Sequence, residues 1–157
     1  MIRRWEPGRA VVDEMLANHQ LQRVPASTEL AQSYLDQARA HVEVSETSVD
    51  RDPVGSFQLA YDAARKALAS LLLVQGLRPT STGGHIAVYD AVLAQFGDGV
   101  LGNIIRPFAT LRRLRNTTEY PSLDQPIATD EDARRAQVQA RAMTDMSAKL
   151  IDQLPVY

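Results

Sequence analysis

The sequence of 157 residues contains no cysteine. Disulfide bonds, thiolate nucleophiles, iron–sulfur clusters and cysteine-ligated zinc are therefore excluded from its chemistry. Histidine is scarce too: His19, His41 and His85 are far apart, and no two have the spacing of helical metal ligands. We therefore expect neither a bound metal nor any other cofactor.

Long apolar runs are also missing. The longest, from Leu68 to Val74, is far shorter than the roughly 18 residues that a membrane span needs. The N-terminus, MIRRWEPGRAVVDEM, carries charge at both ends of a very short apolar run, which is unlike a signal peptide. We therefore expect a cytoplasmic protein without a membrane partner.

The chain has no large excess of charge. Its 17 basic and 19 acidic residues leave a net charge of −2. This balance disfavours a uniformly basic nucleic-acid binder, but it is compatible with a local basic patch. With 45% hydrophobic residues, a chain of this length has enough apolar material for one core and about one domain.

No segment shows sustained alternation of apolar and polar residues, whereas helical periodicity runs through almost every longer segment. Proline, glycine and polar clusters divide the chain, and Ser27 or Thr28, Pro53 and Thr129 are helix-start signals. Pro107 indicates that the helix over 101–118 either is kinked there or starts later. We expect helices over approximately 7–16, 28–47, 53–74, 85–96, 101–118 and 130–154. The prediction is an all-α, up-and-down bundle of four to six helices without strands. Residues 1–25 are expected to be an N-terminal extension with a short helix, and residues 26–157 the bundle.

One helix aims a charged side chain along its apolar face. At 100° per residue, Arg115 shares a narrow stripe with Ile104, Phe108 and Leu111. Arg112 lies at the edge of this face, and Arg113 points the opposite way.

An arginine against a core needs a partner, because burying an unpaired charge is costly. The candidate partners are an internal acid, a second subunit and a phosphate. A phosphate suits the planar guanidinium, which can donate two hydrogen bonds to it at once. A purely structural role is an equal alternative. Arg115 lies in the last turn, where cations favour the helix dipole, and Glu119 follows four residues later.

The order of elements resembles the HEPN superfamily. The similarity lies in the helix PVGSFQLAYDAARKALASLLLVQGLRP, the GGH turn and the helix ending RRLRNTTEYP, and it covers roughly residues 30–150. The resemblance implies a helical bundle that is frequently a homodimer. Many members are metal-independent ribonucleases with an Arg-x4–6-His motif, and others bind RNA or pair with a nucleotidyltransferase in toxin–antitoxin and defence modules.

Carried onto this sequence, the motif arginine is Arg115 and the polar residue after it is Asn116. Tyr120 stands where the histidine belongs, and no histidine follows His85. A histidine with a pKa near ~6.5 can move protons at neutral pH, whereas a tyrosine near ~10 is a poor base. We therefore expect a degenerate motif with lost or much reduced RNA cleavage.

His85 follows Gly83-Gly84, where the backbone can approach closely. It is a candidate to reach the cleft and replace the missing histidine, and an exposed or loop-bonded histidine is the alternative. Candidate catalytic residues are Arg115, Asn116 and Tyr120, and candidate RNA- or phosphate-binding residues are Arg112, Arg115 and His85.

Three functions remain open from the sequence. The leading one is non-catalytic RNA binding, or partnership with a nucleotidyltransferase, in a toxin–antitoxin or defence module. The alternatives are a metal-independent ribonuclease with an altered active site and a structural dimerisation module. A homodimer would bring two copies of the Arg115 region together and double the local basic charge.

Overall fold

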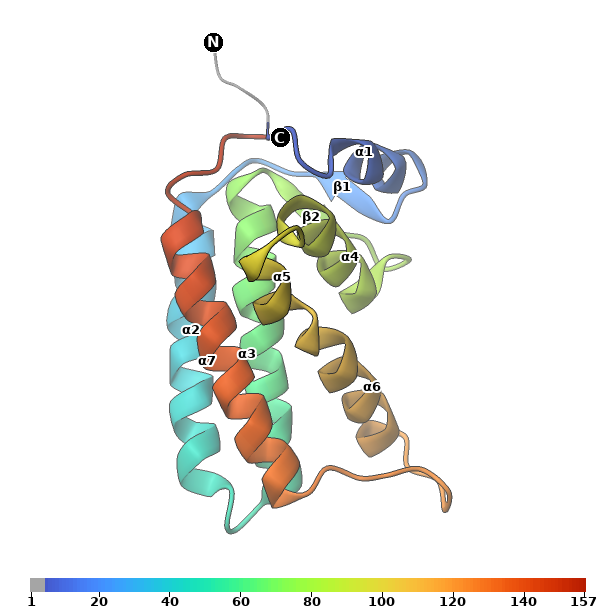
Figure 1. Cartoon of the computed structure of the whole chain (residues 1–157), viewed down its shortest axis with the longest axis vertical. Coiled ribbons are helices and arrows are strands. Elements are labelled where there is room, and N and C mark those ends of the chain that lie inside the picture. Colours follow the sequence, from blue (N-terminus) through green and yellow to red (C-terminus); the bar gives the residue numbers. More distant parts are fainter. Residues whose placement is uncertain (1–4) are drawn as a thin grey trace.

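Three long helices lie side by side and form the body of the molecule (Figure 1). The computed structural model describes residues 5–157. The helices are α1 (Arg9–Ala17), α2 (Thr28–Ser48), α3 (Pro53–Val74), α4 (Gly84–Phe96), α5 (Val100–Ile105), α6 (Pro107–Glu119) and α7 (Asp130–Leu150), and the strands are β1 (Leu21–Arg23) and β2 (Leu77–Pro79). The predicted all-α bundle is confirmed, with α2, α3 and α7 as its long members.

The ends of the long helices follow from local capping chemistry. The Ser27 hydroxyl accepts a hydrogen bond from the backbone N–H of Leu30 at the start of α2. Asp52 caps α3 in the same way, with Pro53 in the first turn. At the start of α7, Thr129 and Asp132 form a reciprocal capping box. These side chains satisfy backbone donors that have no partner inside a helix, so they set the starting points that the sequence predicts.

Helix α3 is the central element of the core. It packs against α2 and α7 and also touches α4 and α6. Its face of small residues, which includes Ala60, Ala64 and Ala67, is completely buried. Small side chains let neighbouring helix backbones approach closely, so α3 can be surrounded on most sides. Every element that positions the candidate site therefore rests on α3.

The expectation of no strands is wrong. Leu21–Arg23 pairs antiparallel with Leu77–Pro79, and Gln22 lies opposite Arg78. Each strand has only three residues, so neither is long enough to show the alternation that marks a strand in sequence. The pairing also joins segments that are far apart in the chain.

The described part of the N-terminal segment packs on the bundle. Helix α1 contacts α4. The Trp5 ring lies 5.2 Å from the Phe96 ring, measured between centroids. At the other end of the chain, the Tyr157 hydroxyl donates to the carboxylate of Asp13 at 2.7 Å, so the C-terminus ends beside α1 (Figure 1).

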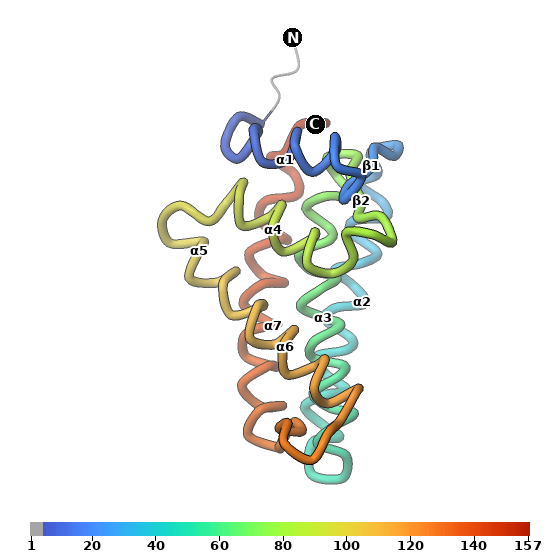
Figure 2. Tube along the Cα trace, turned by 90° about the vertical axis from the view of Figure 1, so that its right-hand side faces the viewer, coloured from blue at the N-terminus to red at the C-terminus, as the bar shows by residue number. Residues whose placement is uncertain are grey.

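The segment around Pro107 is broken rather than continuous. Helix α5 ends at Ile105, and α6 begins at Pro107 and runs along the front of α3 and α7 (Figure 2). The proline lacks a backbone N–H and fits the first turn of a helix, so a new helix starts there. Phe108 and Leu111 are buried on α6 as expected, whereas Ile104 belongs to the separate helix α5.

Within residues 5–157, no helix is both long enough and apolar enough to cross a membrane.

Candidate functional site

The candidate site is built around Tyr61 of α3. This side chain is buried, and its ring stacks on that of Phe108 in α6 with 5.4 Å between centroids. Its hydroxyl is hydrogen-bonded to Nδ1 of His85 at 2.8 Å. Because a buried tyrosine hydroxyl needs a polar partner, this bond fixes His85, at the start of α4, against α3.

Arg115 of α6 lies against the ring of Tyr61. Its guanidinium carbon is 5.8 Å from the centre of the Tyr61 ring, a cation–π distance. Arg115 is half-buried, and its Nη1 is 3.5 Å from the side-chain oxygen of Asn116. Within residues 5–157, no acidic side chain forms a salt bridge with it, so the alternative of a pair with Glu119 is absent.

Three arginines act on His85. Burial lowers the pKa of His85 below its ordinary value, and the positive charges of Arg65, Arg115 and Arg112 lower it further, while Asp62 opposes them. His85 is therefore neutral at pH 7, and the surrounding positive charge is available to an anion. We call Arg65, His85, Arg112 and Arg115, gathered around Tyr61, the arginine cluster.

Tyr61 is neutral as well. Burial raises the pKa of its hydroxyl above the ordinary value, although the charges of Arg115, Arg112 and Arg65 act against this shift. A hydrogen bond between two neutral groups leaves two arrangements of the proton. If Nδ1 of His85 donates to the phenol oxygen, its Nε2 is free to accept a proton.

Asp62 organises the adjacent surface. Arg65 donates to it from Nε and Nη2 at 3.0 and 2.6 Å, and Lys66 and His41 lie 3.1 and 3.4 Å from it. Burial alone would raise the pKa of Asp62, but the hydrogen bonds and charges of Arg65 and Lys66 outweigh it and lower the pKa. Asp62 thus pairs with Arg65 and offsets part of its positive charge, and it forms no salt bridge with Arg115 among the described residues.

Arg112 completes the cluster on α6. It is half-buried, whereas Arg113 is exposed and donates only to Thr110, on its own helix, among the described residues. Burial raises the pKa of Asp90 on α4, and the charge of Arg112 acts in the opposite direction. The two neighbouring arginines therefore have different environments, as the helical spacing predicts.

Tyr120 lies outside the arginine cluster. It is the C-terminal cap of α6, with its side chain 76% exposed. Within the described residues, no hydrogen bond or ring contact joins it to Arg115 or His85. The structure therefore brings together Arg112, Arg115 and His85, leaves Asn116 beside Arg115, and places Tyr120 in solvent.

Tyr61 and Arg65 were not among the residues predicted for the site. The sequence places Tyr61 in an apolar stripe of the third helix, where its ring is indeed buried. The signal was its hydroxyl, because a tyrosine in a core needs a hydrogen-bond partner. Arg65 follows one turn later on the same helix, so Tyr61 could have indicated both.

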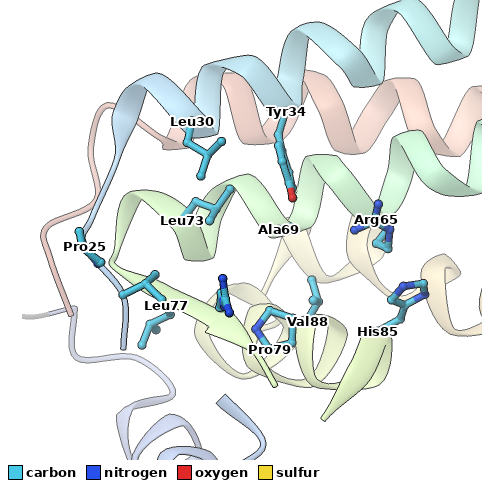
Figure 3. A pocket seen from close by; sticks show the side chains of 12 residues that line it. Pro25, Leu30, Tyr34, Arg65, Ala69, Leu73, Leu77, Pro79, His85 and Val88 are labelled. Carbon is cyan, nitrogen blue, oxygen red and sulfur yellow. The ribbon is translucent and has the colours of Figure 1, made fainter. Parts of the chain in front are cut away.

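A pocket of about 460 Å³ adjoins the cluster. Helices α2, α3 and α4 and strand β2 contribute to its wall (Figure 3). Arg65 and His85 lie near each other at one end, and Pro25, Leu73 and Leu77 lie toward the other. His85 is therefore shared between the pocket and the arginine cluster.

No three histidine, aspartate or glutamate side chains in residues 5–157 gather closely enough to hold a metal ion. The groups available for chemistry at this site are the guanidinium groups, the imidazole of His85 and the phenol of Tyr61. Together they can bind an anion and move a proton.

The fold and the site define an all-α bundle with a basic, half-buried cluster between its third, fourth and sixth helices. The HEPN domain family matches residues 27–150, which is most of the chain. The chain belongs to the HEPN domain family. No curated protein and no solved structure matches it.

Proposed function

We propose that this protein binds RNA through the arginine cluster, without cleaving it, as part of a toxin–antitoxin or defence module. The observation that carries the proposal is that Arg112 and Arg115 are half-buried on one face of α6 with no salt bridge to an acid among residues 5–157. Half-buried positive charges that Asp62 and Asp90 offset only in part are unfavourable, so a ligand that supplies phosphate would stabilise this arrangement.

The arrangement suits a flexible single strand. Guanidinium groups bind phosphate oxygens in pairs, and they can also stack on unpaired bases. Asn116 beside Arg115 adds an amide that can hydrogen-bond to the sugar or to a base edge. Tyr120, exposed on the same helix end, is available to stack on a base further along the strand.

Metal-independent RNA cleavage is the second candidate, and His85 is the observation that favours it. It is neutral, and Tyr61 holds it in place through Nδ1. In this reaction Nε2 would take the proton of a ribose 2′-hydroxyl, and the 2′-oxygen would bond to phosphorus. The bond to the 5′-oxygen would break, and that oxygen would take a proton from water. His85, supplied by α4, would then replace the histidine that the motif lacks after Arg115.

Two partner proposals accompany RNA binding. A homodimer that brings two copies of α6 together would double the number of arginines at the site without changing the fold. A nucleotidyltransferase is the proposed protein partner. Light scattering of Arg115→Glu tests the dimer. Loss of the dimer would support a subunit interface at α6, and an unchanged dimer would contradict that interface.

The test uses labelled single-stranded RNA in EDTA, examined on native and denaturing gels. Wild-type protein and Arg113→Ala should shift the RNA equally, whereas Arg115→Ala should weaken the shift about tenfold or more, which is the loss of one charge-assisted contact. Equal shifts for both variants would contradict the proposal. New RNA ends that disappear in His85→Gln would establish the ribonuclease instead. No shift and no cleavage would favour the structural module.

A further inference from the structure

The pocket beside the arginine cluster has one polar and one apolar end. Its polar lining consists of Arg65, Arg78, His85 and the Tyr34 hydroxyl. The rest of the lining is aliphatic: Val24, Pro25, Leu30, Ala69, Leu73, Leu77, Pro79 and Val88. Its volume of about 460 Å³ lies within the range of small-molecule sites.

The donors at the polar end have unused capacity. Arg65 uses Nε and Nη2 on Asp62, and no described residue takes a hydrogen bond from its Nη1. His85 is bonded through Nδ1, and its Nε2 is a donor in the arrangement where the Tyr61 hydroxyl donates to Nδ1. In the part of the chain that the structure describes, Tyr34 has no hydrogen-bond partner, and its hydroxyl points toward the middle of the pocket (Figure 3).

Arg78 is a weaker anchor than Arg65. It is exposed on β2, and the amide oxygen of Gln22 accepts from its Nε and Nη2 at 2.8 and 3.2 Å in the orientation that satisfies both groups. The side chain of Arg65 is only 21% exposed, so a hydrogen bond to it is less screened by water.

The apolar end is the part that selects the ligand class. A nucleobase needs hydrogen-bond partners along its edge, whereas aliphatic side chains offer none and Gln22 already accepts from two donors of Arg78. An alkyl chain needs only to leave water, which is favourable along this wall. A small head with two oxygens matches the few donors at the other end.

We propose that this pocket binds a medium-chain aliphatic carboxylate. The carboxylate accepts hydrogen bonds from Arg65 and Tyr34 beside His85, and the chain extends toward Leu30, Leu73 and Leu77. This binding goes beyond the proposed function and does not require RNA. Because His85 and Arg65 also belong to the arginine cluster, the occupied pocket adds negative charge there and opposes the binding of phosphate.

Calorimetric titration of the full chain with hexanoate, octanoate and decanoate tests the proposal. Each added methylene group should tighten the dissociation constant about fourfold while the pocket still has room, which corresponds to roughly 0.8 kcal/mol per buried group. Octanoate should bind at least tenfold more tightly than 1-octanol, which lacks the charge. Affinity that does not depend on chain length, or on the charge, would overturn the proposal.

Two variants on α2 form a matched pair. Leu30 lines the pocket and is 45% exposed, and Val44 is 52% exposed on the same helix but does not line it. Leu30→Glu should weaken octanoate binding more than tenfold, because the new charge faces the alkyl chain, and Val44→Glu should leave it within twofold. An acidic residue near the start of a helix is favourable, so Leu30→Glu should still fold. Equal effects would contradict the placement of the chain.

A third variant separates this proposal from RNA binding. Arg115 does not line the pocket, so Arg115→Gln should weaken octanoate binding much less than Leu30→Glu does, even where it abolishes RNA binding. Adenosine monophosphate serves as a competing probe. Displacement of octanoate by adenosine monophosphate at lower concentration, in Arg115→Gln as in the wild type, would show that the pocket is a nucleotide site and would overturn the carboxylate assignment.

Discussion

The salt dependence of RNA binding can be predicted from the charges in the arginine cluster. Arg112 and Arg115 have no salt bridge to a described acid, and Arg65 is partly offset by Asp62. Two to three phosphate contacts are therefore available. For single strands each contact adds about 0.7 to the slope of the logarithm of affinity against the logarithm of salt concentration. We expect a slope of about −1.4 to −2.1 for the wild type.

Changing Arg115 to Gln should reduce the size of this slope by about 0.7. Raising the salt concentration from about 50 to 200 mM should then weaken the wild type about 7- to 18-fold and the variant only about 3- to 7-fold. Fluorescence polarisation with a labelled oligonucleotide measures both slopes.

The matched control is Arg113→Gln, because Arg113 is exposed and lies two residues away on the same helix. Both substitutions remove one positive charge, so they change the long-range field of the protein equally. If Arg113→Gln reduces the slope as much as Arg115→Gln does, the binding is a diffuse charge effect and the reasoning from the cluster is refuted.

Three further predictions concern the fold that holds the site. Burial and neighbouring cations depress the pKa of His41 and of His85, so the unfolded chain binds more protons, and stability should fall as the pH is lowered through about 6.5. Denaturant titrations should show a smaller fall for His85→Gln, and an identical fall would contradict the depressed pKa. Phe108 is fully buried and stacks on Tyr61. Phe108→Ala should therefore lower the free energy of unfolding, measured by urea titration, by about 3–5 kcal/mol, and a loss below about 1 kcal/mol would contradict the packing. A Cβ on Gly83 would collide with the carbonyl oxygen of Gln20, the residue before β1. Gly83→Ala should therefore shift the start of α4 and lower both the melting temperature and the RNA affinity, and unchanged values of both would refute that contact.

Much of the helical framework could be predicted because its signals are local. Ser27, Asp52 with Pro53, and Thr129 are helix-start residues whose effect is felt within one turn. The bounds predicted for α3, residues 53–74, agree with the structure. The β1–β2 pair was missed because its pairing joins distant segments, which no local pattern reports.

In the candidate site, too, local features could be predicted from the sequence and tertiary contacts could not. The direction of Arg115 along the buried face of α6 follows from helical spacing, and the exposed position of Arg113 does too. The meeting of Tyr61 with His85 depends on how α4 packs against α3, which is a tertiary contact. Asp62 and Lys66 are four residues apart on α3, a spacing at which opposite charges pair on a helix surface. The half-buried position of this pair beside His41 depends on how α2 packs against α3, which the spacing does not report.

The most direct test of the central claim is a titration of isotope-labelled protein with single-stranded RNA, following the Nε–Hε signals of individual arginines by NMR. Binding at the cluster predicts that the signals of Arg112 and Arg115 shift first and furthest, while those of Arg113 and Arg135 stay within the noise. Shifts that are largest at Arg113 or Arg135, or no shift at saturating RNA, would contradict the assignment of the cluster as an RNA-binding site.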